Sequence, residues 1–312
     1  MGRGLDRGEG LSLTEQEGRV AEPSAPPPAS GGRFSRLLHR HPAITRNALL
    51  SGPVLWLVLA YLGSLVALLL RSVFQRDELS DELIREPTFD NIRTVLTGDV
   101  YRSTTIRTIG IALIVTLIDL VIALPMATYM AKVARPRARR IMAAAVLMPL
   151  WASYVVKAYA WRALLDPVGG VLQRAVGRSP GYGLAATTIT LAYLWLPYMI
   201  LPIYAGLERL PDSLLEASGD LGARSGRTFR SIVIPMLVPS LLAGSIFTFS
   251  LTIGDYIAVQ FVGGTTQTLG LVVYKFFLGG NDLLAAAFAL VPIAIMGVYL
   301  FLVGRAGALE NL

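Results

Sequence analysis

Six long apolar segments constrain the fold of this chain more than any other feature of its sequence. They cover residues 49–70, 106–131, 141–161, 184–207, 234–253 and 284–303. An α-helix rises 1.5 Å per residue, so about twenty apolar residues cross the roughly 30 Å hydrocarbon core of a bilayer. The sequence therefore predicts an all-α integral membrane protein with six transmembrane helices.

The composition agrees with a membrane protein and excludes several kinds of chemistry. Of 312 residues, 54% are hydrophobic and 16% are charged, which is too apolar for an ordinary soluble domain. The chain has no Cys, so disulfides, thiolate metal sites and Cys nucleophiles are excluded. Its two His residues, His39 and His41, precede the first apolar segment. His-based catalysis and most transition-metal sites are therefore excluded from the membrane part.

The distribution of charge predicts the orientation in the membrane. The net charge is +7, but the basic residues gather on short loops beside the apolar segments, which favours membrane lipid over nucleic acid as the partner. The loop at 132–140 has five basic residues and no acid, and the loop at 208–230 adds four Arg. The loop at 71–105 mixes its Arg residues with seven acidic residues, and the loop at 255–283 has Lys275 as its single basic residue. The positive-inside rule then predicts that both termini and the loop at about 208–234 are cytoplasmic.

The N-terminal region differs from the rest of the chain. Residues 1–32 are rich in Gly, Pro and Ser and lack any apolar period, which is typical of disorder. Residues 33–46 are basic with interleaved apolar residues, and we expect them to lie on anionic headgroups. The predicted organisation is a disordered, basic cytoplasmic tail at 1–47 and a transmembrane domain at 48–312.

A short surface helix is predicted inside the loop at 208–234. Ser213 is placed to cap it, and Glu216 three residues later completes a capping-box pattern. Four residues at i, i+3, i+4 and i+7 form one narrow face: Leu214, Ala217, Ser218 and Leu221. Gly222 ends the helix, a second turn over 227–233 enters the membrane, and Pro235 marks a break before the fifth span. Such a helix fits a groove on a partner; the alternative is that its small residues merely pack on the bundle.

The same loop resembles a known family motif. Glu216, Ala217, Gly222, Ile232 and Pro235 match the EAA loop of ATP-binding-cassette (ABC) importer permeases, with Ser218 and Ile234 as small departures. The resemblance implies the six-helix fold of type I importer permeases with a cytoplasmic coupling helix.

The resemblance also implies which residues and partners take part. The ATPase-coupling residues would be Ser213, Glu216, Ala217, Ser218, Leu221 and Gly222. No G-x-x-x-x-G-K-[ST] nucleotide loop occurs, so the chain is not expected to be an enzyme or to bind a cofactor. ATP and Mg would bind to a partner ATPase dimer. A second, homologous permease and an extracytoplasmic solute-binding protein would complete the transporter, and the acidic loop at 71–105 would form part of its outer docking surface.

Three further segments resemble the polyamine (spermidine/putrescine) permeases of the first membrane-subunit type. They are 148–161, with Met148-Pro149-Leu150-Trp151 at its start, 201–208, and 254–264, which opens with Gly254-Asp255-Tyr256. The resemblance implies a polyamine substrate and a location in the bacterial inner membrane. Permeases for ferric iron, sulfate, opines and other amines share these segments in part and stay open as alternatives.

A flexible polycation needs carboxylates and aromatic faces along its path, and each cation–π contact contributes roughly 0.5–2 kcal/mol. The candidate pathway residues are Asp255, Tyr256, Asp119, Trp151, Tyr154, Tyr159 and Trp161. Asp119 lies inside a span, where an ionisable group indicates a functional role by default. The alternatives are that the aromatics anchor the span ends, that Asp255 caps a helix or pairs with an Arg, and that Asp119 hydrogen-bonds between helices.

Two other classes of protein share single features with this sequence. Gly254-Asp255 resembles part of the aspartyl intramembrane protease motif, but Thr252 replaces its first Gly and the second catalytic aspartate is missing. A self-sufficient secondary transporter would be favoured by inverted repeats and broken-helix ion sites. Neither inverted repeats nor broken-helix ion sites are detectable in the sequence. The intramembrane protease and the secondary transporter are therefore both less favoured than the importer permease.

Overall fold

The computed structural model describes residues 42–76, 83–84 and 87–305. The chain divides into two units, Met1–Leu62 and Gly63–Leu312. In the first unit, α2 (Pro42–Leu57) runs into a π-helical turn, η1 (Val58–Leu62). Helix α2 begins inside the region predicted as tail, and the rest of that tail lies outside the described residues.

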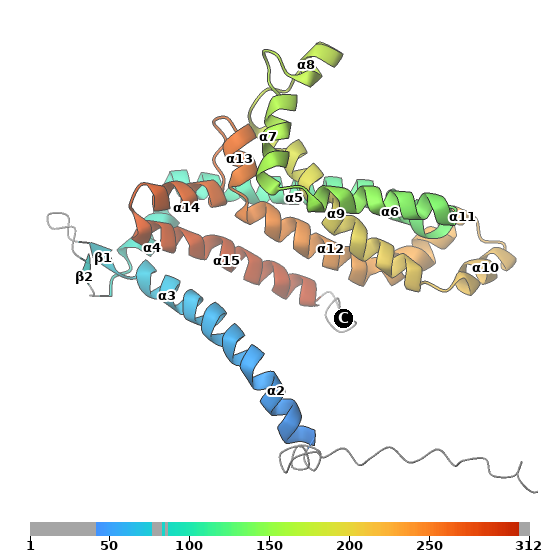
Figure 1. Cartoon of the computed structure of the whole chain (residues 1–312), viewed down its shortest axis with the longest axis horizontal. Coiled ribbons are helices and arrows are strands. Elements are labelled where there is room, and N and C mark those ends of the chain that lie inside the picture. The colour runs from blue at the N-terminus through green and yellow to red at the C-terminus, as the bar shows by residue number, and fades with distance from the viewer. Residues whose placement is uncertain (1–41, 77–82, 85–86, 306–312) are drawn as a thin grey trace, which may run out of the picture. The chain divides into compact units, whose positions relative to one another are not determined.

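The second unit contains the other elements (Figure 1). In chain order they are α3 (Gly63–Ser72), β1 (Gln75–Arg76), β2 (Leu83–Ile84), α4 (Asp90–Thr97), α5 (Asp99–Thr128), η2 (Tyr129–Val133), α6 (Pro136–Trp151), α7 (Tyr154–Leu164), α8 (Val171–Val176), α9 (Leu184–Arg209), α10 (Asp212–Asp220), α11 (Ser225–Thr228), η3 (Phe229–Val233), α12 (Ile234–Gly254), α13 (Ile257–Val262), α14 (Leu269–Leu278) and α15 (Asp282–Arg305). The two short strands pair antiparallel, Gln75 with Ile84.

Three long helices form the centre of this unit. Helices α5, α9 and α12 lie side by side and pack against one another, as Figure 1 shows. Their sequences are apolar on every side, as expected for helices that face either neighbours or lipid. Close approach is helped by Gly244 of α12, because a Cβ atom there would lie 2.7 Å from Met199 Sδ of α9.

Among the residues that the structure describes, five helices are long and apolar enough to cross a membrane: Leu50–Ser72, Asp99–Val133, Leu184–Arg209, Ser225–Gly254 and Asp282–Arg305. The pair α6 and α7 makes a sixth span if it is counted as one. Apart from the pair of two-residue strands, the described residues are helical where they are regular, and their five or six candidate spans confirm the predicted fold class.

The predicted third span, 141–161, is not a single straight helix. Helix α6 ends at Trp151 and α7 begins at Tyr154, and their axes differ in direction by 98°. Ala152 and Ser153 adopt extended backbone angles, with ψ of 142° and 134°, which ends the helical hydrogen bonding. We call this break the α6–α7 elbow.

The predicted break at Pro235 is wrong. Residues Ser225–Gly254 form one continuous helical segment, and Pro235 lies in the first turn of α12. The π-helical turn η3 immediately precedes α12. Proline has no amide donor, and the wider π turn changes the backbone hydrogen-bond pattern just before it, so the helix continues past Pro235. A second π-helical turn, η2, ends the α5 segment.

Candidate functional site

The turn between α12 and α13 places a carboxylate inside the protein. Helix α12 ends at Gly254, Asp255 is extended, and α13 begins at Ile257. Oδ1 of Asp255 accepts a hydrogen bond of 2.9 Å from the Ala258 amide, which satisfies one free donor at the start of α13. Helix α14 approaches this turn so closely that only Gly fits at 270, since a Cβ atom there would lie 2.5 Å from the Gly254 carbonyl oxygen.

The first residue of α7 completes the site. The Tyr154 hydroxyl donates a hydrogen bond to Oδ2 of Asp255. The Tyr154 ring stacks on Trp195 of α9 with centroids 5.7 Å apart, and Trp195 meets Tyr198 edge-on at 5.9 Å. Nζ of Lys157 lies 5.8 Å from the Tyr154 ring centroid. The α6–α7 elbow thus brings an aromatic surface and a hydroxyl donor to the carboxylate.

Burial controls the electrostatics of Asp255, which lies just outside the α12 span and is 7% exposed. Burial raises the pKa of Asp255 to about 6, because the charged form loses solvation, while the Tyr154 hydroxyl and the amides of Ala258 and Val259 lower it in part. The described residues contain no Arg or Lys that forms an ion pair with it. Asp255 is therefore ionised near neutral pH, with no positively charged partner among the described residues.

A cavity of about 320 Å³ opens beside this carboxylate. Asp255, Tyr154, Trp195 and Tyr256 line it together with residues of α12. The Tyr256 ring stacks on Tyr274 of α14, with centroids 4.5 Å apart. The cavity combines a negative charge with aromatic faces, a combination that suits an organic cation.

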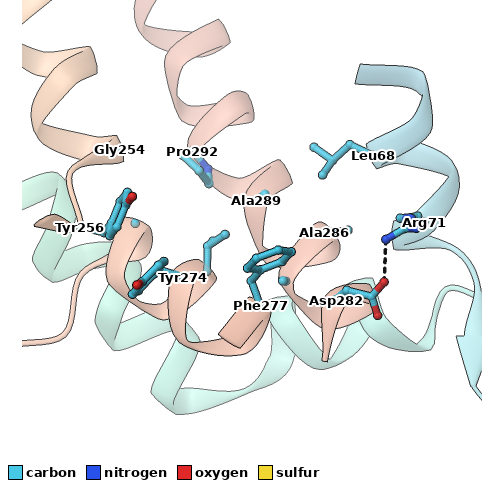
Figure 2. A pocket seen from close by; sticks show the side chains of 13 residues that line it. Leu68, Arg71, Gly254, Tyr256, Tyr274, Phe277, Asp282, Ala286, Ala289 and Pro292 are labelled. Atoms are coloured by element: carbon cyan, nitrogen blue, oxygen red, sulfur yellow. Dashed lines mark hydrogen bonds and ion pairs between the residues drawn. The ribbon is translucent and has the colours of Figure 1, made fainter. Parts of the chain in front are cut away.

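A second cavity, of about 580 Å³, lies among α3, α12, α14 and α15 (Figure 2). Gly254 and Tyr256 border both cavities. At its far edge, Nη1 of Arg71 pairs with Oδ2 of Asp282 at 2.7 Å, as the dashed line in Figure 2 shows. The cavity therefore lies between the last turn of α3 and the start of α15.

The structure brings together three of the seven candidate pathway residues: Tyr154, Asp255 and Tyr256. Trp151, at the elbow, is 92% exposed. Tyr159 meets Phe261 edge-on at 5.9 Å, and Trp161 packs on Tyr193 at 5.2 Å, so neither lines the cavity.

The remaining candidate, Asp119, is fully buried in α5, and both of its carboxyl oxygens lack a hydrogen-bond partner among the described residues. Trp195 lines the cavity but was missed by the sequence reasoning. The available signal was a Trp in the middle of a span, where an interfacial anchoring role does not apply.

Helix α10 is the predicted surface helix, with two differences at its start. It begins at Asp212 with Pro211 as the N-cap, and no side-chain capping hydrogen bond forms, so the predicted capping box at Ser213 and Glu216 is wrong. The physical reason is that Pro211, with φ of −64°, already sets the entry to the helix and places Ser213 inside its first turn.

The end of α10 follows the prediction. Gly222 has φ of +75°, and the amides of Gly222 and Ala223 donate to the carbonyls of Gly219 and Ser218 at 2.8 and 3.0 Å. This is the Schellman arrangement, which requires a left-handed residue.

Helix α10 has one side that faces the protein and one side that is exposed. Ser218 is buried, and its Oγ lies 2.8 Å from Thr228 Oγ1. Leu214, Glu216, Ala217 and Leu221 are exposed, with Leu221 at 88%. Three of the four residues predicted to form one face are thus open to a partner, whereas Ser218 holds the helix to the rest of the protein.

The family described as "Binding-protein-dependent transport system inner membrane component" matches residues 111–308, a range that includes α10, the Asp255 turn and the α6–α7 elbow. The chain belongs to this family. It is a multi-pass membrane protein and an ABC importer permease subunit, and ATP hydrolysis belongs to a separate ATPase.

Two relatives place it more closely within the permeases. The inner membrane ABC transporter permease protein YdcU of Escherichia coli is 40% identical over 300 residues, which cover 90% of this chain and 96% of the relative. The spermidine/putrescine transport system permease protein PotB of Escherichia coli is 30% identical over 235 residues, covering 72% of this chain and 84% of the relative.

Solved structures agree on the fold. The bacterial alginate ABC transporter in complex with an alginate-bound periplasmic protein contains a chain that superposes with a TM-score of 0.66 at 15% identity, covering 88% of this permease and 96% of that chain. The MetNI methionine ABC transporter gives a TM-score of 0.54 at 19% identity, covering 65% and 93%. At these identities the likeness concerns the fold alone.

Proposed function

We propose that this permease forms the pathway for a small organic cation, and that polyamines such as spermidine and putrescine are its substrates. The observation that carries the proposal is the buried Asp255 carboxylate, which faces a cavity lined by Tyr154, Trp195 and Tyr256. Similarity to PotB supports the same substrate class. An ammonium group would exchange its hydration shell for contacts with the carboxylate and with aromatic faces. Each cation–π contact contributes roughly 0.5–2 kcal/mol.

Other substrates of the same importer class are less well supported by the site. A sulfate ion would meet an uncompensated carboxylate at Asp255, which is electrostatically unfavourable. Ferric iron prefers several oxygen or nitrogen side-chain ligands, and the described residues hold no group of three or more His, Cys, Asp or Glu. An opine or another amine would fit the same cavity and is the main alternative. A self-sufficient secondary transporter is disfavoured by membership of the family.

Uptake measured in proteoliposomes tests the substrate assignment. The permease is reconstituted with its partner subunits, and the solute-binding protein encoded beside it supplies labelled spermidine or putrescine. We expect saturable, ATP-dependent uptake of at least one of them. A binding protein that binds an anion or iron, and does not bind polyamines, would show the substrate assignment to be wrong.

We further propose that α10 is the coupling helix and that its exposed face docks on a cytoplasmic ATPase. Glu216 and the exposed Asp220, one turn further along, carry negative charge on this side, and Leu214, Ala217 and Leu221 supply apolar contact. The complete transporter would contain an ATPase dimer that binds ATP and Mg, a second homologous permease and an extracytoplasmic binding protein. Co-purification tests the docking: Glu216→Arg should abolish capture of the ATPase, whereas Asp99→Arg, at the distant start of α5, should not.

The end of the bundle that carries α10 is proposed to face the cytoplasm, with both termini on the same side. The basic residues of the η2–α6 connection and of the α10–α11 region support this orientation. Because the chain has no Cys, single cysteines can report on it. A cysteine at Asp99 should react with an impermeant maleimide in intact spheroplasts, and one at Asp220 only after permeabilisation. The reverse pattern would invert the topology.

A further inference from the structure

Lys132 occupies a junction between the α5 segment and helix α10. It lies in η2, the last turn of the 35-residue helical segment Asp99–Val133. Its Nζ donates to the Leu210 carbonyl oxygen at 2.8 Å and to Oδ1 of Asp212 at 2.7 Å. Leu210 follows α9 directly, and Asp212 is the first residue of α10. One side chain therefore holds the connection by which the chain enters α10.

The burial of Lys132 makes this contact more than a surface ion pair. Its side chain is 17% exposed and Leu210 is buried, although the Asp212 side chain is 76% exposed. An exposed ion pair alone contributes little, because water and salt screen it. A charged donor on the carbonyl of a buried residue contributes more, since loss of the donor leaves a desolvated oxygen unpaired. We call the Lys132–Leu210–Asp212 contact the α10 clasp.

The inner face of α10 is partly open: Leu215 packs against the hydrophobic cluster that includes Leu207 and Leu210, but a space remains beside it. A cavity of about 290 Å³ lies beneath it, lined by Leu215 and Gly219 of α10 and by Thr128, Lys132 and Phe229 of the surrounding helices. At the far end of the helix, the Ser218–Thr228 hydrogen bond joins α10 to α11. Of the two polar anchors of α10, only the clasp leads to the α5 segment.

The α5 segment carries this connection to the Asp255 turn. At 1.5 Å per residue its 35 residues extend for about 50 Å. In its other half, Ile111 and Val115 belong to the same hydrophobic cluster as Ala258. The Ala258 amide is the donor that holds Asp255 Oδ1. A single long helix thus touches α10 at one end and supports the candidate substrate carboxylate nearer the other.

We propose that Lys132 is a positioning residue that makes α10 and the adjacent end of α5 move as one body, so that movement of α10 reaches the Asp255 turn. This inference rests on the proposed role of α10 as the coupling helix. Without the Lys132 side chain, α10 would tilt over the cavity beneath it and α5 would stay in place. ATP hydrolysis would then continue while transport fell.

The ratio of substrate transported to ATP hydrolysed tests the clasp. In proteoliposomes holding the complete transporter, Lys132→Met should lower this ratio about tenfold, with ATPase capture unchanged. Lys132→Arg, which keeps a charged donor, should retain at least half of the ratio. Arg140→Gln is the matched control, because Arg140 lies in the same basic loop, is exposed, and forms no hydrogen bond or ion pair with a described residue. An unchanged ratio in Lys132→Met would overturn the proposal.

A distance measurement tests the common movement directly and does not depend on the variant assembling. Spin labels on cysteines introduced at Val133 of η2 and Asp220 of α10, both exposed, report the distance between the two elements. In otherwise unaltered transporter, one narrow distribution should persist with and without a non-hydrolysable ATP analogue. A shift of several ångströms on nucleotide binding would overturn the proposal. In Lys132→Met, the distribution should broaden or shift.

Failure of the clasp and failure of the coupling assignment have different signatures. If α10 is not the coupling helix, Glu216→Arg retains the ATPase, whatever Lys132→Met does. If only the clasp proposal is wrong, Glu216→Arg loses the ATPase while Lys132→Met retains a normal ratio of transport to hydrolysis.

Discussion

The Tyr154 hydroxyl donates to the Asp255 carboxylate across 101 positions of sequence, and this hydrogen bond joins the α6–α7 elbow to the end of α12. Tyr154 also stacks on Trp195, so the same ring connects three helices at one cavity. The carboxylate is held by one side-chain donor and by the Ala258 amide. A substrate ammonium would compete with these donors for the same oxygens, which makes the pair the natural target for mutagenesis.

Asp255→Asn should lower polyamine uptake at least tenfold at pH 7.5. The amide keeps nearly the same shape but removes the buried charge that attracts a cation, and a tenfold loss corresponds to about 1.4 kcal/mol. Labelled putrescine uptake in proteoliposomes measures the effect. Asp99→Asn is the matched control, because Asp99 is a fully exposed carboxylate at the start of α5. Equal uptake by Asp255→Asn and the unaltered permease would remove Asp255 from the pathway.

Uptake should fall as the pH decreases through about 6. The pKa of Asp255 is raised to about 6 by burial, so the carboxylate is charged at pH 7.5 and mostly protonated at pH 5. Transport that needs the charged form is therefore present above the pKa and lost below it, by about tenfold at one unit under it. Dividing by the uptake of Asp255→Asn removes the pH dependence of the other subunits. A flat corrected profile would contradict the assignment.

Tyr154→Phe should move that midpoint to higher pH. The variant keeps the ring that stacks on Trp195 and removes the hydroxyl whose hydrogen bond lowers the pKa of Asp255. Without this donor, the pKa of Asp255 rises further, because burial still disfavours the charged carboxylate and one hydrogen bond that stabilises it is lost. The same corrected pH profile measures the shift. Tyr159→Phe, outside the cavity, should leave the midpoint where it was.

Gly222→Val should weaken capture of the ATPase about tenfold, whereas Gly222→Asn should be tolerated. Gly222 has φ of +75°, and a branched residue in the left-handed region costs about 1–2 kcal/mol. Asn adopts that region more readily and is found at helix ends for this reason. Gly226→Ala is the control, since Gly226 has an ordinary φ and open space around its Cβ position. Affinity for the purified ATPase measures the effect.

Asp119→Leu should raise thermal stability and lower uptake. Both carboxyl oxygens are buried without a hydrogen-bond partner among the described residues, so an apolar side chain removes a group that this conformation does not satisfy. Burying a carboxyl group without hydrogen bonds costs free energy, and the apolar side chain avoids that cost. A fall in the melting temperature would mean that Asp119 has a stabilising partner. Thr190→Val, which removes another buried and unpartnered oxygen, should retain uptake.

The sequence predicted the parts of this fold that depend on length and composition. The long apolar segments became α5, α9, α12 and α15 because a bilayer-length helix needs only apolar side chains over about twenty residues. The exposed helix ending at Gly222 was predictable because its signals are local: a polar setting, a narrow face and a glycine. The start of the same helix was not, because Pro211 and Ser213 offered competing entry signals and the proline set the N-cap.

The candidate site could be predicted only in part. Asp255 and Tyr154 were identifiable as a carboxylate and an aromatic ring, but their pairing depends on the angle between α6 and α7. That angle arises from two extended residues, Ala152 and Ser153, which are small and unremarkable in an apolar run. Trp195 was missed because its meaning depends on which face of α9 meets α7, and the uniformly apolar sequence of α9 does not specify that face.

The elbow also determines how the Asp255 site can change shape. Helix α7 has 11 residues and is therefore about 16 Å long, so a 10° change at Ala152–Ser153 moves its far end by about 3 Å. Tyr154 stands beside the pivot, where the same rotation turns its ring without carrying it far. A bend at this elbow would therefore change the angle of the Tyr154 ring beside Asp255 while both neighbouring helices remain intact.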